Sequence, residues 1–465
     1  ASQRVTISAG LRWEMYPIFR DRFGKMTSYL AGAQSKRFPN APAGLLFVGD
    51  PGYPYRDDRN NLGPRLGVAW DVFGNGKTSL RSSAGVFYEP ITGEMAGGVL
   101  LPQPFGLTNN LDAPFALSAP YRGVRNPFPY VVDPASAKFV MPLLIPKSFD
   151  PGLRIPYTMN YSLGIQQQLT RTVMVEVAYV GNVGRKLPGM RETNPAVYRA
   201  GATTATTNAR RVLAPTYGSI GTLNTAGTSS YNGLQVRAAK KFGKGLTFTS
   251  AYTWAKAIDV YGGGAFAQVT QQSPQNVFDL LADRGRSEND VRQRWVSSYL
   301  YELPFLRGTQ WYARLFGGWE LGGILTAETG KPVTVMTGRD NSLSGVNFDR
   351  PNVSGAPELP ADRPRAELIN RYFKTEVFSA NLPGQYGNAG RSIMNSPGSF
   401  GWDTSLSKMF RVRERHSLQF RWDAFSLLNR PNLGSPNSTF TSPSFGRIQS
   451  AGGGRVMQVS LKYTF

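Results

Sequence analysis

His416 is the only histidine of the chain, and it lies between Arg415 and Ser417, so a serine–histidine pair is the first catalytic arrangement to weigh. A serine nucleophile needs a general base and a third group that orients this base. No acidic residue can be identified from the sequence as the group that would orient this histidine. His416 also falls in a short connection between two predicted strands. We therefore predict an exposed histidine without a catalytic role, and a protein that is not an enzyme.

Two segments, Asp57–Asn61 and Asp283–Asp290, bring acids, amides and arginines close together. Calcium favours several oxygen ligands at such spacing, but the interleaved arginines compete for the same carboxylates, so we predict ion pairs that order loops. The glycine runs Gly262–Gly264 and Gly452–Gly454 lack the Lys-Ser/Thr pair and helix start of a phosphate loop. With no cysteine and one histidine, thiolate and multi-histidine metal sites are excluded, and we predict neither metal nor cofactor.

The dominant pattern of the chain is an alternation of apolar and polar residues over about ten positions, the period of a β-strand with unlike faces. No apolar stretch approaches the roughly 18 residues of a membrane-spanning helix. The alternation predicts about twelve strands, at 4–16, 65–73, 77–88, 157–169, 173–179, 232–242, 246–255, 293–303, 318–328, 402–410, 417–427 and 455–465.

The connections between these strands alternate in length. The short ones include the glycine turn Gly74–Gly76, and the long ones, rich in Gly, Pro and Asn, are 17–64, 89–156, 181–230, 256–292, 329–401 and 428–454. Tight turns on one rim and long loops on the other are typical of an outer-membrane barrel. We predict an all-β fold, a transmembrane antiparallel up-and-down β-barrel with extracellular long loops. A soluble sandwich or propeller would also alternate, but its strands usually have five or six residues.

Charged residues on the polar sides of these strands are the candidates to line a lumen. They are Arg12, Glu14, Arg81, Glu176, Arg237, Arg421 and Asp423. They either contact a plug or a passing solute, or only hydrate and cross-link the wall. Their collective polarity predicts a wet interior.

The last ten residues, Val456–Phe465, alternate and end on phenylalanine, and they resemble the terminal signal read by the bacterial barrel-assembly machinery, carried here by Leu461, Tyr463 and Phe465. Further segments resemble the barrel of an Oar-like TonB-dependent receptor, the subgroup whose chains begin with a carboxypeptidase-regulatory-like domain. They are Ser230–Arg237, Phe248–Lys256, Tyr301–Phe305, Gly317–Ile324, Gly387–Arg391 and Phe425–Asn432. The resemblance is strong after about Tyr231 and mostly one of pattern before Tyr157.

The resemblance implies a 22-stranded barrel in the cell outer membrane of a Gram-negative bacterium, filled by an N-terminal plug that TonB contacts. This sequence has no plug, TonB box or regulatory-like domain and about twelve strands, so we expect the C-terminal strands of a longer receptor; a short twelve-stranded relative is the alternative. The implied function is energised uptake of an unknown substrate bound by the loops. A structural subunit or an export or assembly conduit is the rival function.

The net charge of +22 would first suggest a nucleic-acid partner. The long connections carry a net +11, the short-turn rim +10 and the strand walls +1, so the excess lies at both ends. The predicted periplasmic basic rim includes Lys240, Lys241, Lys244, Arg411, Arg413 and Arg415. Basic groups near an anionic lipid surface gain on the order of 1 kcal/mol each. We therefore predict outer-membrane lipid and lipopolysaccharide as partners, and no nucleic acid.

Overall fold

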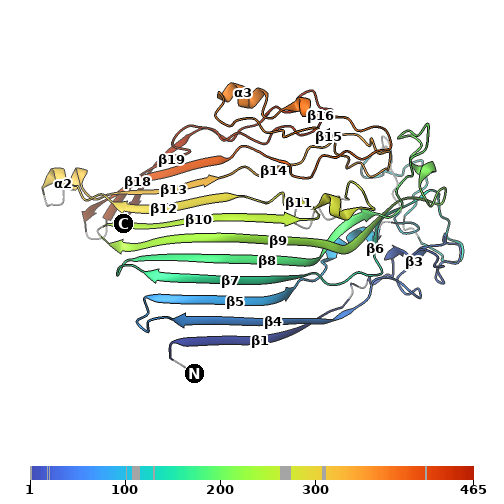
Figure 1. The fold of residues 1–465 in the computed structure, drawn as a ribbon, viewed down its shortest axis with the longest axis horizontal. Coiled ribbons are helices and arrows are strands. Elements are labelled where there is room, and N and C mark those ends of the chain that lie inside the picture. The colour runs from blue at the N-terminus through green and yellow to red at the C-terminus, as the bar shows by residue number, and fades with distance from the viewer. Residues whose placement is uncertain are drawn as a thin grey trace.

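Twelve long strands form one antiparallel up-and-down sheet, which confirms the predicted fold class (Figure 1). The structure, a computed structural model, describes residues 3–17, 19, 21–100, 102–106, 111, 116–128, 131–243, 245–261, 274–305, 310–413 and 416–465. In spatial order the strands are β1 (Val5–Tyr16), β4 (Asp58–Asp71), β5 (Thr78–Tyr88), β7 (Tyr157–Gln168), β8 (Val173–Glu192), β9 (Tyr217–Gly243), β10 (Leu246–Asp259), β12 (Gln293–Glu302), β13 (Trp319–Glu328), β18 (Ser399–Arg413), β19 (His416–Phe425) and β20 (Val456–Thr464).

Both described chain ends and the short turns lie at one end of the sheet, on the left of Figure 1, which we call the short-turn end. The opposite end carries the long connections and is called the long-loop end. The turn between β4 and β5 is held by Asp71, whose carboxylate accepts hydrogen bonds from the backbone N–H groups of Gly74 and Gly76 at 3.0 and 2.8 Å. Both glycines have positive φ, which a tight hairpin turn requires and glycine adopts without strain.

The two faces of the sheet differ in polarity because side chains alternate along each strand. The face that carries Arg12, Arg81 and Arg237 is called the polar face. The other, which carries Leu11, Val177 and Leu461, is called the apolar face. Large side chains on the apolar face remain exposed, with Leu11 at 70% and Leu461 at 65%. An apolar surface of this extent requires a non-aqueous neighbour.

The packed hydrophobic clusters of the described residues lie at the long-loop end, in the folded loops and against the extensions of β8 and β9. Three clusters of buried residues are centred on Phe149 and Leu223, on Phe47 and Ile145, and on Val335 and Phe373. The first two join connections 17–64 and 89–156 to the extended parts of β8 and β9. The loops at this end are therefore folded units with cores of their own.

Short elements build these folded loops. They are β2 (Thr27–Tyr29) paired with β3 (Leu45–Phe47), β6 (Leu143–Phe149) parallel to β9, β11 (Gly285–Arg286) on β10, β14 (Pro332–Val333) with β17 (Met394–Asn395), β15 (Asn352–Val353) with β16 (Phe378–Ser379), helices α1 (Gly93–Ala96), α2 (Trp311–Phe316) and α3 (Arg365–Asn370), and 3-10 helices η1 (Gly97–Leu100), η2 (Asn208–Arg210), η3 (Leu280–Asp283) and η4 (Thr375–Val377). Among the described residues, no helix is long and apolar enough to cross a bilayer.

All twelve predicted strands are present, but three extend at least seven residues further toward the long-loop end than predicted. β4 begins at Asp58 instead of 65, β8 ends at Glu192 instead of 179, and β9 begins at Tyr217 instead of 232. The extension of β9 is covered by β6, so Ile220 and Leu223 are fully buried and the period-two alternation is lost. The description of 181–230 as irregular was therefore wrong at both ends.

Candidate functional site

All seven charged residues predicted to line a lumen lie on the polar face. The cross-strand register places them on this face: Arg81 pairs with Gly164, Glu176 with Gln166 and Arg237, Arg421 with Ser407, and Asp423 with Ser405. The registers of β1 with β4 and of β4 with β5 place Arg12 and Glu14 on the same face. The two side chains form an ion pair with each other. That this face encloses a lumen stays a prediction.

Two of these residues border a hollow on the polar face. Arg421 Nε lies 2.9 Å from a carboxylate oxygen of Asp423, and both line a depression of about 540 Å³ with Glu320 and Asp403. The floor of the depression comes from five strands between β10 and β19. Charged and hydroxyl side chains dominate this wall, so it can hold water or a polar solute.

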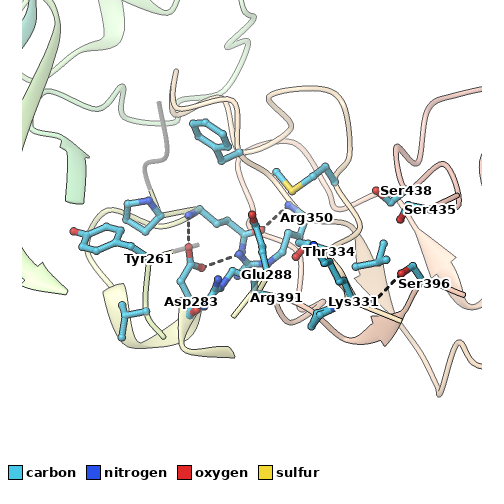
Figure 2. Close-up of a pocket in the computed structure, with 17 residues that line it drawn as sticks. Tyr261, Asp283, Glu288, Lys331, Thr334, Arg350, Arg391, Ser396, Ser435 and Ser438 are labelled. Atoms are coloured by element: carbon cyan, nitrogen blue, oxygen red, sulfur yellow. Dashed lines mark hydrogen bonds and ion pairs between the residues drawn. The ribbon is translucent and has the colours of Figure 1, made fainter. Parts of the chain in front are cut away.

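A larger pocket, of about 630 Å³, lies at the long-loop end where three connections meet (Figure 2). Connection 256–292 supplies Tyr261 and Asp283, connection 329–401 supplies Lys331 and Arg350, and connection 428–454 supplies Ser435 and Ser438. Val333, Met336 and Phe348 add apolar surface. A mixed lining of this size is typical of a site for a small ligand.

Buried ion pairs fix the walls of this pocket. Arg350 Nη1 lies 2.7 Å from Asp283 Oδ1, and both side chains are buried. Arg350 also donates a 2.7 Å hydrogen bond from Nε to the carbonyl of Ala389, and Asp283 accepts one from the backbone N–H of Gln275. A charge withdrawn from water is stable only with such partners, so these contacts make the pocket a preformed cavity.

Arg391 forms a second link between the same connections. Its guanidinium pairs with Asp259 and donates hydrogen bonds to the carbonyls of Asp259 and Asp283, at 2.7 and 2.9 Å. Gly387, four residues before Arg391, lies close to the backbone of Arg350. A Cβ added at Gly387 would lie 2.0 Å from the carbonyl oxygen of Arg350. The segment Gly387–Arg391, which the sequence offered only as a family resemblance, therefore has a structural role beside the pocket.

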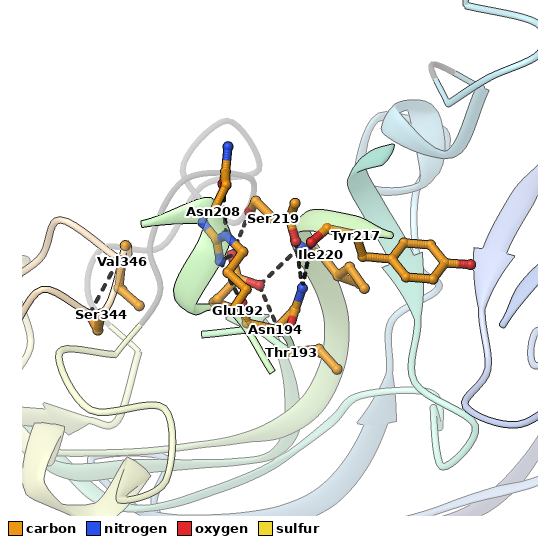
Figure 3. Close-up of polar contacts among 12 residues, drawn as sticks. Glu192, Thr193, Asn194, Asn208, Tyr217, Ser219, Ile220, Ser344 and Val346 are labelled. Atoms are coloured by element: carbon orange, nitrogen blue, oxygen red, sulfur yellow. Dashed lines mark hydrogen bonds and ion pairs between the residues drawn. The ribbon is translucent and has the colours of Figure 1, made fainter. Parts of the chain in front are cut away.

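A further polar network supports the base of connection 181–230 (Figure 3). The Glu192 carboxylate accepts hydrogen bonds from the backbone N–H groups of Asn194 and Ile220, at 2.7 and 2.9 Å, and lies 3.3 Å from Arg211 Nη1. Arg210, also buried, donates to the carbonyl of Leu343 in connection 329–401. Separate loops are thus tied together by buried arginines.

The predicted ion pairs are present in both acidic segments, although Asp58–Asn61 belongs to strand β4 and not, as predicted, to a loop. Arg59 lies 2.9 Å from Asp57, Arg286 lies 2.8 Å from Asp290, and Asp283 pairs with Arg350 of a distant connection. In the described part of the chain, no group of three or more His, Cys, Asp and Glu side chains is placed to hold a metal ion. Gly262–Gly264 lies outside the described residues.

His416 begins β19 at the short-turn end, and its Nδ1 lies 2.6 Å from the hydroxyl of Tyr463. The ring of Tyr463 stacks on Phe465, and Leu461 lies exposed on the apolar face two positions earlier. His416 therefore contributes to the junction between β19 and the terminal strand. The role of the C-terminal residues as an assembly signal stays a prediction.

The basic rim divides between the two faces. Lys240 lies on the apolar face opposite Phe248, whereas Lys241 borders a hollow at the short-turn end with Lys77, Arg81 and Arg171. Arg411 is exposed near the end of β18, and the backbone of Arg413 pairs with His416. Lys244 and Arg415 lie outside the described residues.

Sequence reasoning did not single out the pocket residues Lys331, Arg350 and Thr334, nor Glu192 and Arg211. They sit in segments without periodicity, and their partners are distant in sequence: Arg350 meets Asp283 only in the folded loops. The one available signal was the excess of arginine in long connections.

The exposed apolar face, the up-and-down order of twelve strands and the folded loops at one end together define an outer-membrane β-barrel protein. The chain belongs to the family of the outer membrane beta barrel domain, whose model matches residues 1–458. It therefore resides in the cell outer membrane. No curated protein shows a significant sequence match.

Several solved structures have a similar fold at low sequence identity. The outer membrane transporter YddB from Escherichia coli is 10% identical, with 88% of this chain and 41% of that chain covered and a TM-score of 0.48. The FrpB iron transporter from Neisseria meningitidis is 12% identical (100% and 44% covered, TM-score 0.44), and the siderophore receptor PiuA from Acinetobacter baumannii is 7% identical (100% and 41%, TM-score 0.45). The chain thus spans less than half the length of these proteins.

Proposed function

We propose that this chain is the barrel portion of a TonB-dependent outer-membrane receptor of the Oar-like subgroup, which takes up a substrate bound by its long loops. The observation that carries the proposal is the pocket between connections 256–292, 329–401 and 428–454, on a barrel of the outer-membrane family. A cavity that is already ordered by buried ion pairs binds a ligand without a large ordering cost.

In this function the residues bind and guide a solute and perform no covalent chemistry. Lys331 is exposed, whereas Arg350 and Asp283 are committed to each other, so Lys331 is the pocket cation available to a ligand. The polar face would supply the path inward, with a plug filling the barrel and TonB driving its rearrangement. The surrounding partners would be phospholipid, lipopolysaccharide and, through Leu461, Tyr463 and Phe465, the barrel-assembly machinery.

Uptake assays in cells that produce the full-length receptor test the proposal. Cells with and without the receptor, and with or without TonB, are given radiolabelled ferric siderophores, oligosaccharides and peptides. We expect one class to accumulate only when both proteins are present. Lys331→Glu should reduce its accumulation at least fivefold, whereas Lys374→Glu, in the same connection but outside the pocket, should not.

The competing function is that of a structural subunit or of an export or assembly conduit. For this function, we expect no TonB-dependent accumulation of solute. Loss of the receptor would then change envelope integrity or secretion, while accumulation of all three solute classes would be the same with and without TonB. That result would contradict energised uptake.

A further inference from the structure

A short helix at the short-turn end exposes a group of large apolar side chains. Helix α2 connects β12 to β13 and projects beyond the sheet in Figure 1. Trp311 is 74% exposed, Phe316 55%, Leu315 46% and Tyr312 40%, whereas Ala313 is buried. Phe305, which precedes the helix, is 60% exposed. Aromatic side chains exposed together in this way mark a surface that meets something other than water.

The exposed side chains form one continuous side of the helix. Successive residues of an α-helix are about 100° apart, so Trp311, Leu315, Tyr312 and Phe316 occupy an arc of about 140°. Ala313 lies outside this arc and faces the protein. The rings of Trp311 and Tyr312 meet edge to face at 6.0 Å. The helix therefore has one apolar side, presented outward.

Lys408 fixes the position of this helix relative to the sheet. It lies on the apolar face, opposite Trp319 and Phe420, and its side chain is buried. Its ammonium group donates hydrogen bonds to the carbonyls of Leu315, at 3.0 Å, and of Gly317, at the C-terminal end of α2. It also lies 4.9 Å from the ring centre of Phe410. A cation at this end of a helix is favoured by the free carbonyls there.

Because Lys408 belongs to the apolar face, the C-terminal end of α2 lies on the same side of the sheet as the lipid-facing surface of this outer-membrane barrel. The helix joins strands well inside the sheet order. Eight strands, ending with β12, lie on one side of it, and four, beginning with β13, lie on the other. A neighbour at either sheet edge would thus not cover it. The exposed arc combines two aromatic rings that carry polar atoms, Trp311 and Tyr312, with the apolar side chains of Leu315 and Phe316. Side chains of this kind are favoured at the boundary between the headgroups and the acyl chains of a bilayer.

We propose that α2 is an interfacial anchor, which buries Trp311, Tyr312, Leu315 and Phe316 in the headgroup region of the leaflet at the short-turn end. Lys408 is the positioning residue that holds it there. The occupant of this surface is the phospholipid bilayer. The anchor fixes the depth of the barrel in the membrane and does not depend on the substrate.

The absence of native cysteine makes the test direct. Leu315→Cys carries a nitrobenzoxadiazole label, and the full chain is inserted in phosphatidylcholine–phosphatidylglycerol vesicles. Asn75→Cys, in the β4–β5 turn at the same end, is the matched control. We expect blue-shifted emission at 315 and at least twofold quenching by lipids brominated near the headgroup, and neither effect at 75.

Two outcomes would overturn the proposal. Emission at 315 that is as red and as unquenched as at 75 would place α2 in water. Emission that shifts only as the protein-to-lipid ratio rises would indicate contact with a second copy. Lys408→Met, in the 315-labelled chain, should at least halve the lipid quenching while the gel shift of the folded barrel on heating is retained, and Lys408→Arg should restore it. Unchanged quenching in Lys408→Met would remove the positioning role.

Discussion

The guanidinium of Arg350 and the carboxylate of Asp283 form a buried ion pair, 2.7 Å long, that joins two loops separated by two strands of the sheet order, β12 and β13. Both side chains are buried, and each has a backbone partner as well. The pair closes one wall of the long-loop pocket (Figure 2). Its integrity should therefore decide whether the pocket exists.

Arg350→Ala should open connections 256–292 and 329–401 while leaving the strands intact. Removing one partner of a buried pair leaves an uncompensated charge, which costs about 3–5 kcal/mol. Hydrogen exchange should become at least tenfold faster in both connections and stay unchanged in β12 and β13. Arg371→Ala is the control, because Arg371 and Glu376 form an exposed pair in the same connection and water replaces their contact. Equal effects of both variants would contradict a special role of Arg350.

Gly221→Ala should separate β6 from the extension of β9. An added Cβ would lie 2.5 Å from the carbonyl oxygen of Pro146, which is backbone and cannot swing aside. Overpacking of this kind typically costs about 1–3 kcal/mol, and cleavage of connection 89–156 by protease should be correspondingly faster. Gly10→Ala, in β1, meets no atom within 4 Å and should leave cleavage unchanged.

The same region shows where sequence reasoning succeeds and where it ends. Both ends of strands such as β7 and β20 were predicted within one residue. The two faces of these strands have different environments, so the polarity of their residues alternates along the sequence. From Tyr217 to Leu223 both faces of β9 are covered by protein, so polarity no longer alternates and glycines serve close packing. A pattern of period two contains no information about such a segment.

The pocket was beyond prediction for a different reason. The acid–arginine composition of Asp283–Asp290 predicted ion pairing correctly, and Asp290 does pair locally with Arg286. Asp283 instead pairs with Arg350, which lies 67 positions away. Sequence spacing does not predict such a contact, because the sheet between the two loops determines their relative position. The types of interaction were thus predictable, and the partners were not.

The stability of connection 329–401 should decrease as pH rises, owing to Asp349. Burial raises the pKa of this carboxyl above its usual 3.8, although Ser342 donates hydrogen bonds to it from its backbone N–H and hydroxyl. A raised pKa means that the folded loop holds the proton more tightly, so the stabilisation is complete below 3.8 and is lost as pH passes the raised value. Hydrogen exchange of 337–350, corrected for intrinsic rates, should accelerate over this window.

Asp349→Asn should remove that pH dependence, since an amide does not titrate and can still accept one hydrogen bond from Ser342. Asp133→Asn, in connection 89–156, should leave the exchange of 337–350 unchanged. A slope that persists in Asp349→Asn would assign the effect to another group.

Single cysteines should map the two faces of the sheet, because the native chain has none. Glu176 and Val177 are neighbours on β8 and lie on the polar and apolar faces, as do Arg237 and Val236 on β9. If the polar face lines a wet lumen, Glu176→Cys and Arg237→Cys in vesicles should react with a charged maleimide at least tenfold faster than Val177→Cys and Val236→Cys. In denaturant all four should react alike, which controls for intrinsic reactivity. Since each pair differs by one position, depth and strand are matched, and equal protection of both members would contradict a water-filled interior.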